Sequence, residues 1–289
     1  MMHPGRLQRA LLHYRWGTER EVLPRLRLHL TYMWRHRRRL DLAAPRLFTE
    51  RVQHRKLHDR DQRLPLYADK LGVKSIVADR LGTDWVIPTL WHGETLPAVP
   101  PWPRPFVVKS RHGCKQVAFV RTPDVDWPAL RTRAARWVER RYGYWLDEWL
   151  YAVIPRGLLV EPFVGTGDRL PVDYKLFVFG GEVAYVQVHL ARERAHRWLV
   201  LDLDWRPMIP GGETPPRPAS LPAMIAAAQE LSRGFAFVRV DFYEVSGVPK
   251  FGEMTFYPGS GLDPVNPPHL DAVMGDLWRK ALSYTPIAD

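Results

Sequence analysis

The chain has 289 residues, with 42 Lys and Arg against 31 Asp and Glu, a formal charge of +11 at pH 7 and a hydrophobic content of 46%. This content is ordinary for a globular protein with a sizeable core, and the single cysteine excludes an internal disulfide framework. No apolar run approaches the roughly 18 residues of a membrane span, and the N-terminus lacks the apolar segment of a secretion signal. We therefore expect a cytoplasmic protein with a reduced thiol.

The positive charge is concentrated at the N-terminus. Residues 1–60 hold fifteen Arg and Lys and five Asp and Glu, a difference of +10, so the rest of the chain is close to neutral. Residues 6–40 are predicted to be helical, because large apolar residues recur there at helical spacing between arginines: Leu23, Leu26, Leu30 and Met33. Such a basic amphipathic pattern is typical of a peripheral helix on an anionic membrane surface, and also of a helix docked on its own catalytic domain. A merely solvated basic face is a further alternative, and nucleic acid is the least expected partner, since no recognition module is visible.

The middle of the chain alternates helical and extended patterns. In chain order, we expect a helix over 69–81, a short extended piece over 85–88, a proline-rich connector over 97–105, a strand over 106–109, a mostly helical stretch over 127–149 broken near Tyr142 and Gly143, and a strand over 158–161.

The C-terminal half is richer in hairpin signals. We expect a hairpin over 176–186 that turns on Gly180 and Gly181, a Pro/Gly loop over 211–218, a helix over 221–232, a hairpin of strands 237–243 and 250–256 around Ser246 and Gly247, and a helix over 271–282. Strands grouped as hairpins with helices between them favour an α+β fold over a doubly wound parallel sheet.

Two carboxylates lie on the strands of the last hairpin, Asp241 on the first and Glu253 on the second. Because strand side chains alternate between faces, both can point to the same face. Two such carboxylates repel each other unless something neutralises them, and a hard divalent cation such as Mg²⁺ does so with oxygen ligands. The alternative is a pair of exposed strand residues facing solvent.

A lysine ends the predicted strand 106–109, and a polar loop follows it over 110–115. An ammonium group in this position can contact phosphate oxygens while loop amides bind others. The loop does not match the P-loop pattern, so by itself Lys109 could be an ordinary surface lysine. The strand ending at Glu161 runs into a short connector, which could offer its backbone to an adenine edge.

The order of these features resembles the ATP-grasp superfamily and, within it, the TupA-like ATP-grasp family, which is associated with polysaccharide and teichuronopeptide biosynthesis. The likeness runs from about residue 48 to the end and is carried by residues 48–53, 55–61, 68–74, 108–113, 173–177 and 251–259. It implies two α+β subdomains that clasp ATP, at approximately 66–164 and 165–289 within an ATP-grasp domain of 48–289. Residues 1–47 form a basic helical extension outside the likeness.

The resemblance also implies roles for individual residues. It implies that Lys70, Lys109, His112 and Gly113 lie on the ATP phosphates, that Glu161, Pro162, Phe163 and Val164 form the adenine and ribose hinge, and that Asp173 and Lys175 form an acidic–basic pair near the nucleotide. It implies that Arg192 and Arg197 face the substrate or the transferred phosphoryl group, that Asp241, Glu253 and Thr255 hold Mg²⁺, that Arg239 stabilises a tetrahedral intermediate, and that residues 258–261 close the site.

The chain departs from the family pattern at three places. Thr255 stands where the superfamily usually has Asn, Arg111 stands where the family usually has Asn, and Cys114 and Lys115 occupy the part of the phosphate loop that is usually rich in glycine and serine. Fewer glycines allow fewer close backbone approaches to phosphate. Positive charge on Arg111 and Lys115 could offset that loss.

The function implied by the resemblance is an ATP-dependent carboxylate–amine ligase that forms an amide through an acyl phosphate, with an amino-acid or uronic-acid carboxylate on a cell-envelope glycan as acceptor. Two alternatives stay open: a kinase or other phosphoryl transferase on the same fold, and a non-catalytic subunit that binds nucleotide or glycan. We expect removal of residues 1–40 to impair localisation at the inner face of the membrane more than catalysis.

Overall fold

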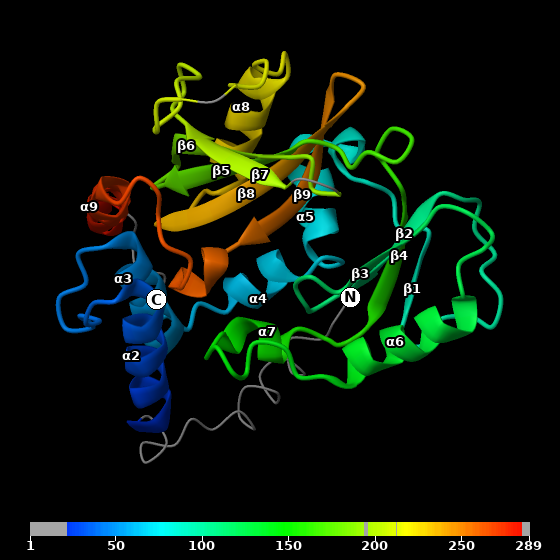
Figure 1. The fold of residues 1–289 in the computed structure, drawn as a ribbon, viewed down its shortest axis with the longest axis horizontal. Helices are drawn as coiled ribbons and strands as arrows, with labels where there is room; N and C mark the ends of the chain where they lie inside the picture. Colours follow the sequence, from blue (N-terminus) through cyan, green and yellow to red (C-terminus); the bar gives the residue numbers. More distant parts are fainter. Residues whose placement is uncertain (1–21, 194–195, 212, 285–289) are drawn as a thin grey trace.

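The computed structural model describes residues 22–193, 196–211 and 213–284, and its architecture is two antiparallel sheets with helices around them (Figure 1). The small sheet has the strand order β1-β4-β2-β3, with β1 (Trp91–Gly93), β2 (Phe106–Ser110), β3 (Val117–Val120) and β4 (Leu158–Pro162). The large sheet has the order β7-β6-β5-β8-β9, with β5 (Asp173–Phe179), β6 (Glu182–Leu190), β7 (Arg197–Leu201), β8 (Phe237–Val245) and β9 (Val248–Thr255). The predicted α+β class is confirmed.

Two tight turns build the large sheet. Gly180 and Gly181, with φ of 59° and 90°, join β5 to β6, and Ser246 and Gly247, with φ of 52° and 79°, join β8 to β9. Left-handed conformations at both central residues match the twist of the flanking strands, which is why glycine is favoured at these turns. Both predicted hairpins are confirmed.

The core lies on one face of the large sheet. Helix α8 (Leu221–Leu231) packs on this face, which carries fully buried side chains such as Leu176, Val186, Val240 and Met254. Because the side-chain period of a strand is two, the residues between them point to the opposite face. Along β8 these alternate residues change from aromatic at Phe237 to charged at Arg239 and Asp241.

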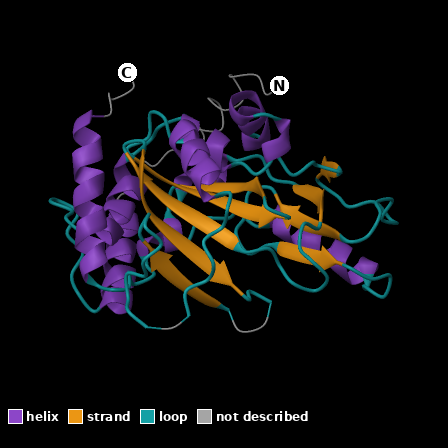
Figure 2. Ribbon diagram, turned by 90° about the horizontal axis from the view of Figure 1, so that it is seen from above, coloured by secondary structure: helices purple, strands orange, loops and turns teal. Residues whose placement is uncertain are grey.

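Helices cover the aromatic end of that opposite face. Phe48 of α3 (Phe48–His58) lies edge-on to Phe237, with ring centroids 4.9 Å apart, and Trp278 of α9 (His269–Tyr284) lies 4.5 Å from the same ring. Figure 2 shows these helices gathered at the end of the large sheet that is farthest from the small sheet. The charged stretch of β8 is thereby left between the helices and the small sheet.

The small sheet has its own apolar core against α6 (Trp127–Glu139). The side chain of Asp126 caps this helix by accepting a hydrogen bond from the Ala129 amide (2.9 Å), and Pro128 lies in its first turn. Beyond α6, the chain turns through 140–148, forms the short helix α7 (Trp149–Val153) and enters β4. The predicted helix over 127–149 is therefore shorter than expected, and it ends at Glu139.

Helix α2 (Val22–His36) docks on the part of the chain that follows it. Its Leu28 and Tyr32 are buried, and the Tyr32 hydroxyl lies 2.9 Å from Thr49 Oγ1. Arg38, just past the helix, forms an ion pair with the buried Asp271. The part of the predicted helix before residue 22 lies outside the described residues. In the described ranges, no helix combines the length and the apolar character that crossing a bilayer requires.

Several short elements differ from the prediction. The expected helix over 69–81 begins at Val73 as α5 (Val73–Leu81), because Asp69 to Gly72 form a turn in which the Asp69 carboxylate accepts from the Leu71 amide (3.1 Å). Residues 86–89 form no strand and follow the 3-10 turn η2 (Thr83–Trp85). Strands β1, β3 and β7 were not predicted; each is short and depends on a neighbouring strand for its hydrogen bonds. Helix α4 (Arg63–Ala68) precedes the turn.

Candidate active site

A buried ion cluster occupies the charged stretch of the large sheet. Lys175 of β5 lies opposite Asp241 of β8, and its Nζ contacts Asp241 Oδ2 at 2.5 Å and Asp173 Oδ2 at 2.7 Å. Arg239 donates through Nε to Asp241 Oδ1 and through Nη2 to Asp241 Oδ2, both at 2.7 Å. This bidentate geometry is the strong form of an arginine–carboxylate pair.

The neighbouring strand β9 adds oxygen donors to the cluster. Glu253 lies directly opposite Asp241 in the β8–β9 register, and Thr255 lies opposite Arg239. Directly opposed residues share a face, so the predicted placement of both carboxylates on one face is confirmed. Arg239 Nη2 also reaches Thr255 Oγ1 (3.0 Å) and, at a longer distance, Glu253 Oε1 (3.4 Å).

The pairs fix the charge state of the cluster. Burial on its own would raise the pKa of Asp241, but the positive charges of Arg239 and Lys175 outweigh it and hold that pKa below its usual value. Burial would likewise lower the pKa of Lys175, and the charges of Asp241 and Asp173 raise it instead. Asp241 and Lys175 therefore stay ionised at neutral pH, and the polar face carries fixed charges of both signs.

The donor set fits a magnesium ion shared with a nucleotide. The Glu253 side chain is 39% exposed and makes its long contact with Arg239, so its carboxylate oxygens face the space in front of the sheet. Asp241 adds a carboxylate and Thr255 a hydroxyl on the same face, and hard oxygens of this kind are what Mg²⁺ prefers. Among the described residues, no three His, Cys, Asp or Glu side chains gather into a metal site, so phosphate and water oxygens would have to complete the coordination.

The small sheet presents a second ion cluster, centred on Glu161 of β4. Lys109 of β2 contacts Glu161 Oε2 at 2.6 Å, and Lys74 of α5 contacts Oε1. Burial alone would raise the pKa of Glu161, and the two lysines lower it. Lys109 also interacts electrostatically with Glu253 and Tyr243 of the large sheet. The charged residues of the two sheets therefore lie near each other around Lys109 and Glu253. Lys74 was not among the residues predicted from the sequence.

The predicted phosphate loop, residues 110–115, is anchored by the turn before α5. Lys70 Nζ donates to the Gly113 carbonyl (2.5 Å), and Arg111 forms a bidentate pair with Asp69 (2.7 and 2.5 Å). Arg111 is thus neutralised by a carboxylate and holds the loop in place, which corrects the interpretation that its charge replaces the missing glycines. Lys115, exposed and with φ of 58°, lies at the tip of the loop.

The remaining predicted site residues are His112, the hinge residues 162–164, Arg192 and Arg197, and within the described part of the chain only Arg192 contacts one of the two ion clusters. His112 is buried, with Nε2 3.3 Å from the Arg140 carbonyl. In the hinge, Pro162 lies opposite Phe106 in the β2–β4 register, the Phe163 amide donates to the Pro105 carbonyl (3.1 Å), and Val164 is half-buried. Arg192 donates to Asp173 (3.2 Å) and so joins the large-sheet cluster. Arg197 starts β7, and its contact in the described residues is with Glu213 at 3.7 Å.

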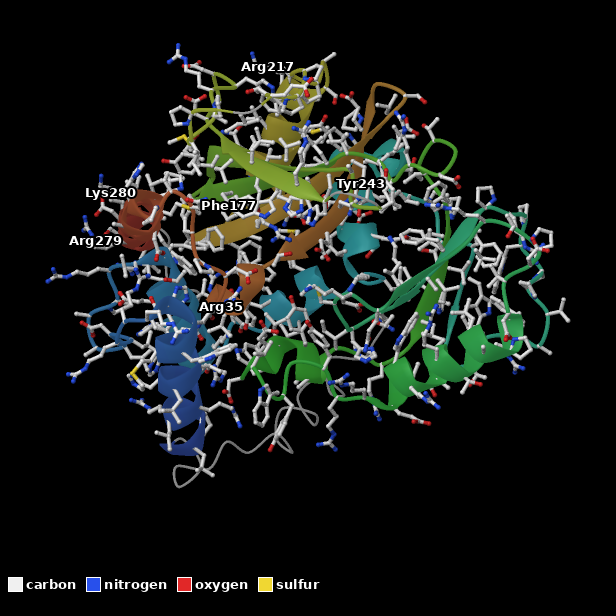
Figure 3. All side chains as sticks on the ribbon, viewed as in Figure 1. Arg35, Phe177, Arg217, Tyr243, Arg279 and Lys280 are labelled. Atoms are coloured by element: carbon white, nitrogen blue, oxygen red, sulfur yellow. The ribbon has the colours of Figure 1, made fainter. Side chains whose placement is uncertain are left out.

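A cavity of about 450 Å³ adjoins the large-sheet cluster. The sheet contributes Phe177, Tyr185, Gln187, His189, Trp198, Val200 and Arg239 to its wall, and the segment after β9 contributes Pro258, Gly259, Asp263, Pro264, Val265 and Asn266. His189 Nδ1 lies 2.9 Å from His196 Nε2. Figure 3 places Phe177 on the sheet and Arg35 below it, beside the turn η3 (Pro258–Gly261). Sequence reasoning missed these residues, although alternation along β6 puts Tyr185, Gln187 and His189 on the face of Lys175.

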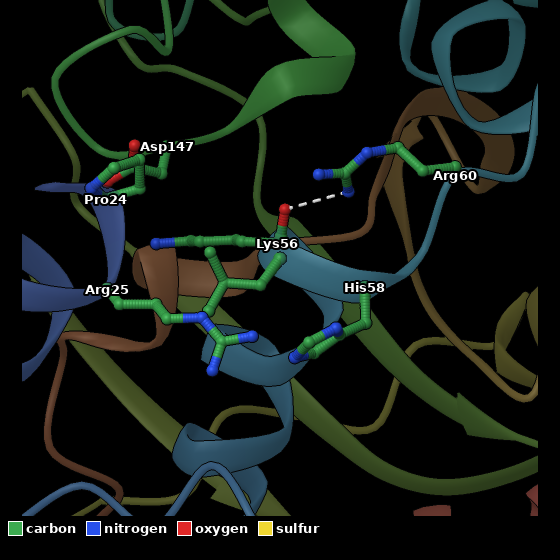
Figure 4. Close-up of a pocket in the computed structure, with 7 residues that line it drawn as sticks. Pro24, Arg25, Lys56, His58, Arg60 and Asp147 are labelled. Carbon is green, nitrogen blue, oxygen red and sulfur yellow. Dashed lines mark hydrogen bonds between the residues drawn. The ribbon is translucent and has the colours of Figure 1, made fainter. Parts of the chain in front are cut away.

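A buried lysine anchors the turn η3, whose Pro258 and Gly259 line this cavity. Lys56 donates to the carbonyl (2.7 Å) and the hydroxyl (2.6 Å) of Ser260 in η3, and Gln53 donates to the same carbonyl (2.8 Å). Burial lowers the pKa of Lys56 to about 8. Beside it is a small hollow of about 20 Å³, shown in Figure 4, where Arg60 donates to the Lys56 carbonyl. The position of η3 thus depends on contacts from α3.

Two facing antiparallel sheets, one with a lysine at a phosphate-type loop and the other with paired carboxylates on its last hairpin, define an ATP-grasp protein. Residues 50–279 match the family described as TupA-like ATP-grasp. Since the match covers most of the chain, the protein belongs to the TupA-like ATP-grasp family, as the resemblance indicated.

The similar solved structures are of ligases. D-alanine–D-alanine ligase from Bacillus anthracis is 14% identical with a TM-score of 0.48, over 76% of this chain and 67% of the ligase. The same enzyme complexed with ATP is 15% identical with a TM-score of 0.47, over 76% and 65%. The ATP-grasp ligase PsnB complexed with a minimal precursor is 11% identical with a TM-score of 0.44, over 76% and 62%. The chain thus spans between 62% and 67% of their lengths. Among curated proteins, no match is found.

Proposed function

We propose that this protein is an ATP-dependent ligase that joins a carboxylate to an amine. The observation that carries the proposal is the quartet on β8 and β9, in which Arg239, Asp241, Glu253 and Thr255 occupy one face as two directly opposed pairs. Family membership gives the fold, and this quartet supplies a guanidinium beside oxygen donors at the place where an acyl group would react.

The proposed reaction has two steps. An oxygen of the substrate carboxylate attacks the γ-phosphorus of ATP, ADP leaves, and an acyl phosphate forms. An amine nitrogen then attacks the acyl carbon, the nitrogen loses a proton to solvent, and inorganic phosphate leaves as the amide forms. Both steps place negative charge near Arg239, whose fixed guanidinium stabilises it without reorganisation.

The chain's own residues would hold the nucleotide between the sheets. Lys109 and Lys70 are placed beside the phosphate loop and would neutralise phosphate oxygens, while Glu161 to Val164 would border the adenine. Mg²⁺, when bound by Asp241, Glu253 and Thr255, would neutralise phosphate charge during transfer. On this proposal the two sheets correspond to the two ATP-grasp subdomains, at approximately 66–164 and 165–289.

The family's association suggests the acceptor. We infer that the carboxylate belongs to an amino acid or a uronic acid of a cell-envelope polysaccharide, and that the enzyme works on the cytoplasmic side. Hydroxylamine tests the reaction without knowledge of the amine, because it converts an acyl phosphate into a hydroxamate and inorganic phosphate. We expect ADP release and hydroxamate formation over a panel of amino acids and uronic-acid saccharides.

The variant Glu253→Gln separates the competing functions. We expect it to lose about 100-fold or more of the ADP release while its circular dichroism stays that of the wild type. Wild-type activity in this variant would contradict the assignment of Glu253 as a magnesium ligand. ADP release that needs no amine or hydroxylamine would make the protein a kinase, and absence of Mg-ATP binding in calorimetry would make it a non-catalytic subunit.

We also infer that the outer face of α2, the side that is not docked on the protein, binds a membrane surface. One side of the helix is docked, and the opposite side exposes five large apolar residues, among them Leu23 at 66% and Trp34 at 67%; the other three are Leu26, Leu30 and Met33. At helical spacing these five form a stripe about 100° wide, and the segment is rich in arginine. An apolar stripe edged by positive charge suits anionic lipid.

Sedimentation with vesicles tests this inference. The full chain should bind vesicles containing phosphatidylglycerol and bind neutral phosphatidylcholine vesicles far less. Replacing Leu26 and Leu30 by Glu should abolish the binding, whereas replacing the exposed Val99 and Val248 by Glu should leave it intact. Equal binding of the α2 variant and the control would exclude a lipid role for the stripe.

A further inference from the structure

We propose that the cavity beside Arg239 is the acceptor site, and that it selects an acceptor with two anionic groups, one at Arg239 and the other at Arg35 of the N-terminal helix. This inference rests on the proposed ligase function, because it identifies the class of carboxylate that the ligase activates.

The position of the cavity links it to the chemistry. Arg239 belongs both to the ion cluster and to the cavity wall. A carboxylate bound in the cavity against this guanidinium would therefore lie beside the proposed magnesium ligands, where the γ-phosphate would be delivered. A cavity of about 450 Å³ is within the usual range for a site that encloses a compact organic molecule.

The charge of the wall favours an anion. Three of its residues are cationic, Arg35, Lys115 and Arg239, of which Arg239 is already paired with Asp241, and Asp263 supplies a single negative charge. The two histidines do not reverse this balance, since burial and the nearby charge of Lys175 lower the pKa of His189 to about 4 and leave it neutral. The wall therefore has an excess of positive charge, which attracts negatively charged ligands.

Arg35 lies outside the family-matched region and is held at the wall by contacts with residues inside it. Its Nε donates to the Leu262 carbonyl (3.0 Å), and the neighbouring His36 ring lies 3.0 Å from the Gly261 carbonyl. Its guanidinium pairs with Asp263 at 3.6 Å, and both side chains are largely exposed, so this ion pair is weak. Arg35 is thus positioned by a backbone carbonyl and can exchange its weak partner for a ligand carboxylate or phosphate.

The rest of the wall suits a compact body between two charged ends. Aromatic and aliphatic side chains also line the cavity with Arg239 and Arg35, including Phe177, Trp198 and Met274, and Gln187 and Asn266 add amide groups that can orient polar atoms. A ligand with one anion would leave the Arg35 end of this wall without a partner. A dianion of suitable length engages both ends.

The test compares dianions with monoanions of the same shape. Calorimetry in the presence of Mg-ADP would measure glutarate against glutaramate, and adipate against adipamate, on the wild type, Arg35→Ala, Arg35→Lys and Arg39→Ala. Arg39 is a matched control, because it is an exposed arginine of the same basic run and does not line the cavity.

We expect the wild type and Arg39→Ala to bind at least one dianion about tenfold more tightly than its monoamide. Arg35→Ala should lose this preference, and Arg35→Lys should keep part of it, while the affinity for Mg-ADP stays unchanged in all four proteins. Equal binding of dianion and monoamide by the wild type, no binding of either length, or a preference that survives in Arg35→Ala would overturn the assignment.

The outcome is separable from that of the ligase proposal. Dianion binding that depends on Arg35, without hydroxamate formation, would keep the binding site and reject the ligase. Hydroxamate formation with equal use of dianions and monoamides would keep the ligase and reject the role of Arg35.

Discussion

The two ion clusters of the site are built from the same residue types and differ in how they are held. In the large sheet, Arg239, Asp241 and Lys175 sit on paired strands, and their positions follow from the register. In the small sheet, Glu161 and Lys109 also sit on paired strands, but Lys74 comes from helix α5. Next to this second cluster, Arg111 and Lys70 hold the phosphate loop in place, Arg111 by pairing with Asp69 and Lys70 by donating to the Gly113 carbonyl. The first cluster is therefore fixed by strand register alone, whereas the charged groups at and beside the second also depend on a helix, a turn and a loop.

Asp241→Asn should have the largest effect and would break the rigid cluster. The substitution leaves Lys175 and Arg239 buried without their main carboxylate, and we expect a loss of about 3 kcal/mol in the free energy of unfolding, measured in urea. Glu253→Gln, one strand away and 39% exposed, should cost less than about 1 kcal/mol. Equal losses in the two variants would mean that Asp241 is not the electrostatic centre of the cluster.

Glu161→Gln probes the opposite side of the cleft and should have an intermediate effect. It leaves Lys74 and Lys109 next to each other without a carboxylate, but both lysine side chains keep some exposure to water, at 14% and 24%. We expect a loss of about 2 kcal/mol in the same urea experiment. A loss larger than that of Asp241→Asn would reverse the ranking of the two clusters.

Arg111→Asn restores the residue that the family usually has and tests the shape of the phosphate loop. Because Arg111 is paired with Asp69, its removal should weaken Mg-ATP binding by about fivefold through a looser loop, measured by calorimetry. Asp69→Asn should have a similar effect, and the double variant should be no worse than either single one. Additive losses would instead show that Arg111 contacts the nucleotide independently.

The smallest predicted effect concerns pH. The pKa of His189 is about 4 in the folded protein and close to 6.5 in the unfolded chain, so between these values the unfolded chain binds a proton that the folded protein does not. The stability should therefore fall by about 1 kcal/mol as the pH drops from 6.5 to 4, after allowance for partial exposure. In His189→Gln, the melting temperature should depend less steeply on pH over this range. An unchanged dependence on pH would contradict the role of His189.

The N-terminal extension shows where sequence reasoning fell short. Its helical, basic and amphipathic character was predictable from residues 22–36, but the docked face was not. Tyr32, Arg35 and Arg38 contact Thr49, Leu262 and Asp271, so we now expect removal of residues 1–40 to impair catalysis as well as membrane contact. Periodicity identifies a helix with an apolar side, but it cannot say which partner that side meets.

The hairpins were predictable for a different reason. Gly180–Gly181 and Ser246–Gly247 encode their turns locally, and alternation along the strands then fixes which residues share a face. That logic places Asp241 beside Glu253 without any knowledge of the fold. It does not extend to β1, which receives its hydrogen bonds from β4 far along the chain, or to the short strands β3 and β7, which pair with the preceding strand across longer connections.

By itself, the sequence determined the family, the α+β class and the carboxylate pair on the last hairpin, because each depends on local turns, alternation or the order of motifs. Tertiary structure alone decided that Arg111 is paired with Asp69, that Lys74 shares Glu161 with Lys109, and that Arg35 from outside the matched region lines the cavity beside Arg239. The residues in these arrangements lie between 42 and more than 200 positions apart in the sequence, and no short-range pattern specifies them. Long-range packing of the two sheets and α2 therefore sets the chemistry of the site.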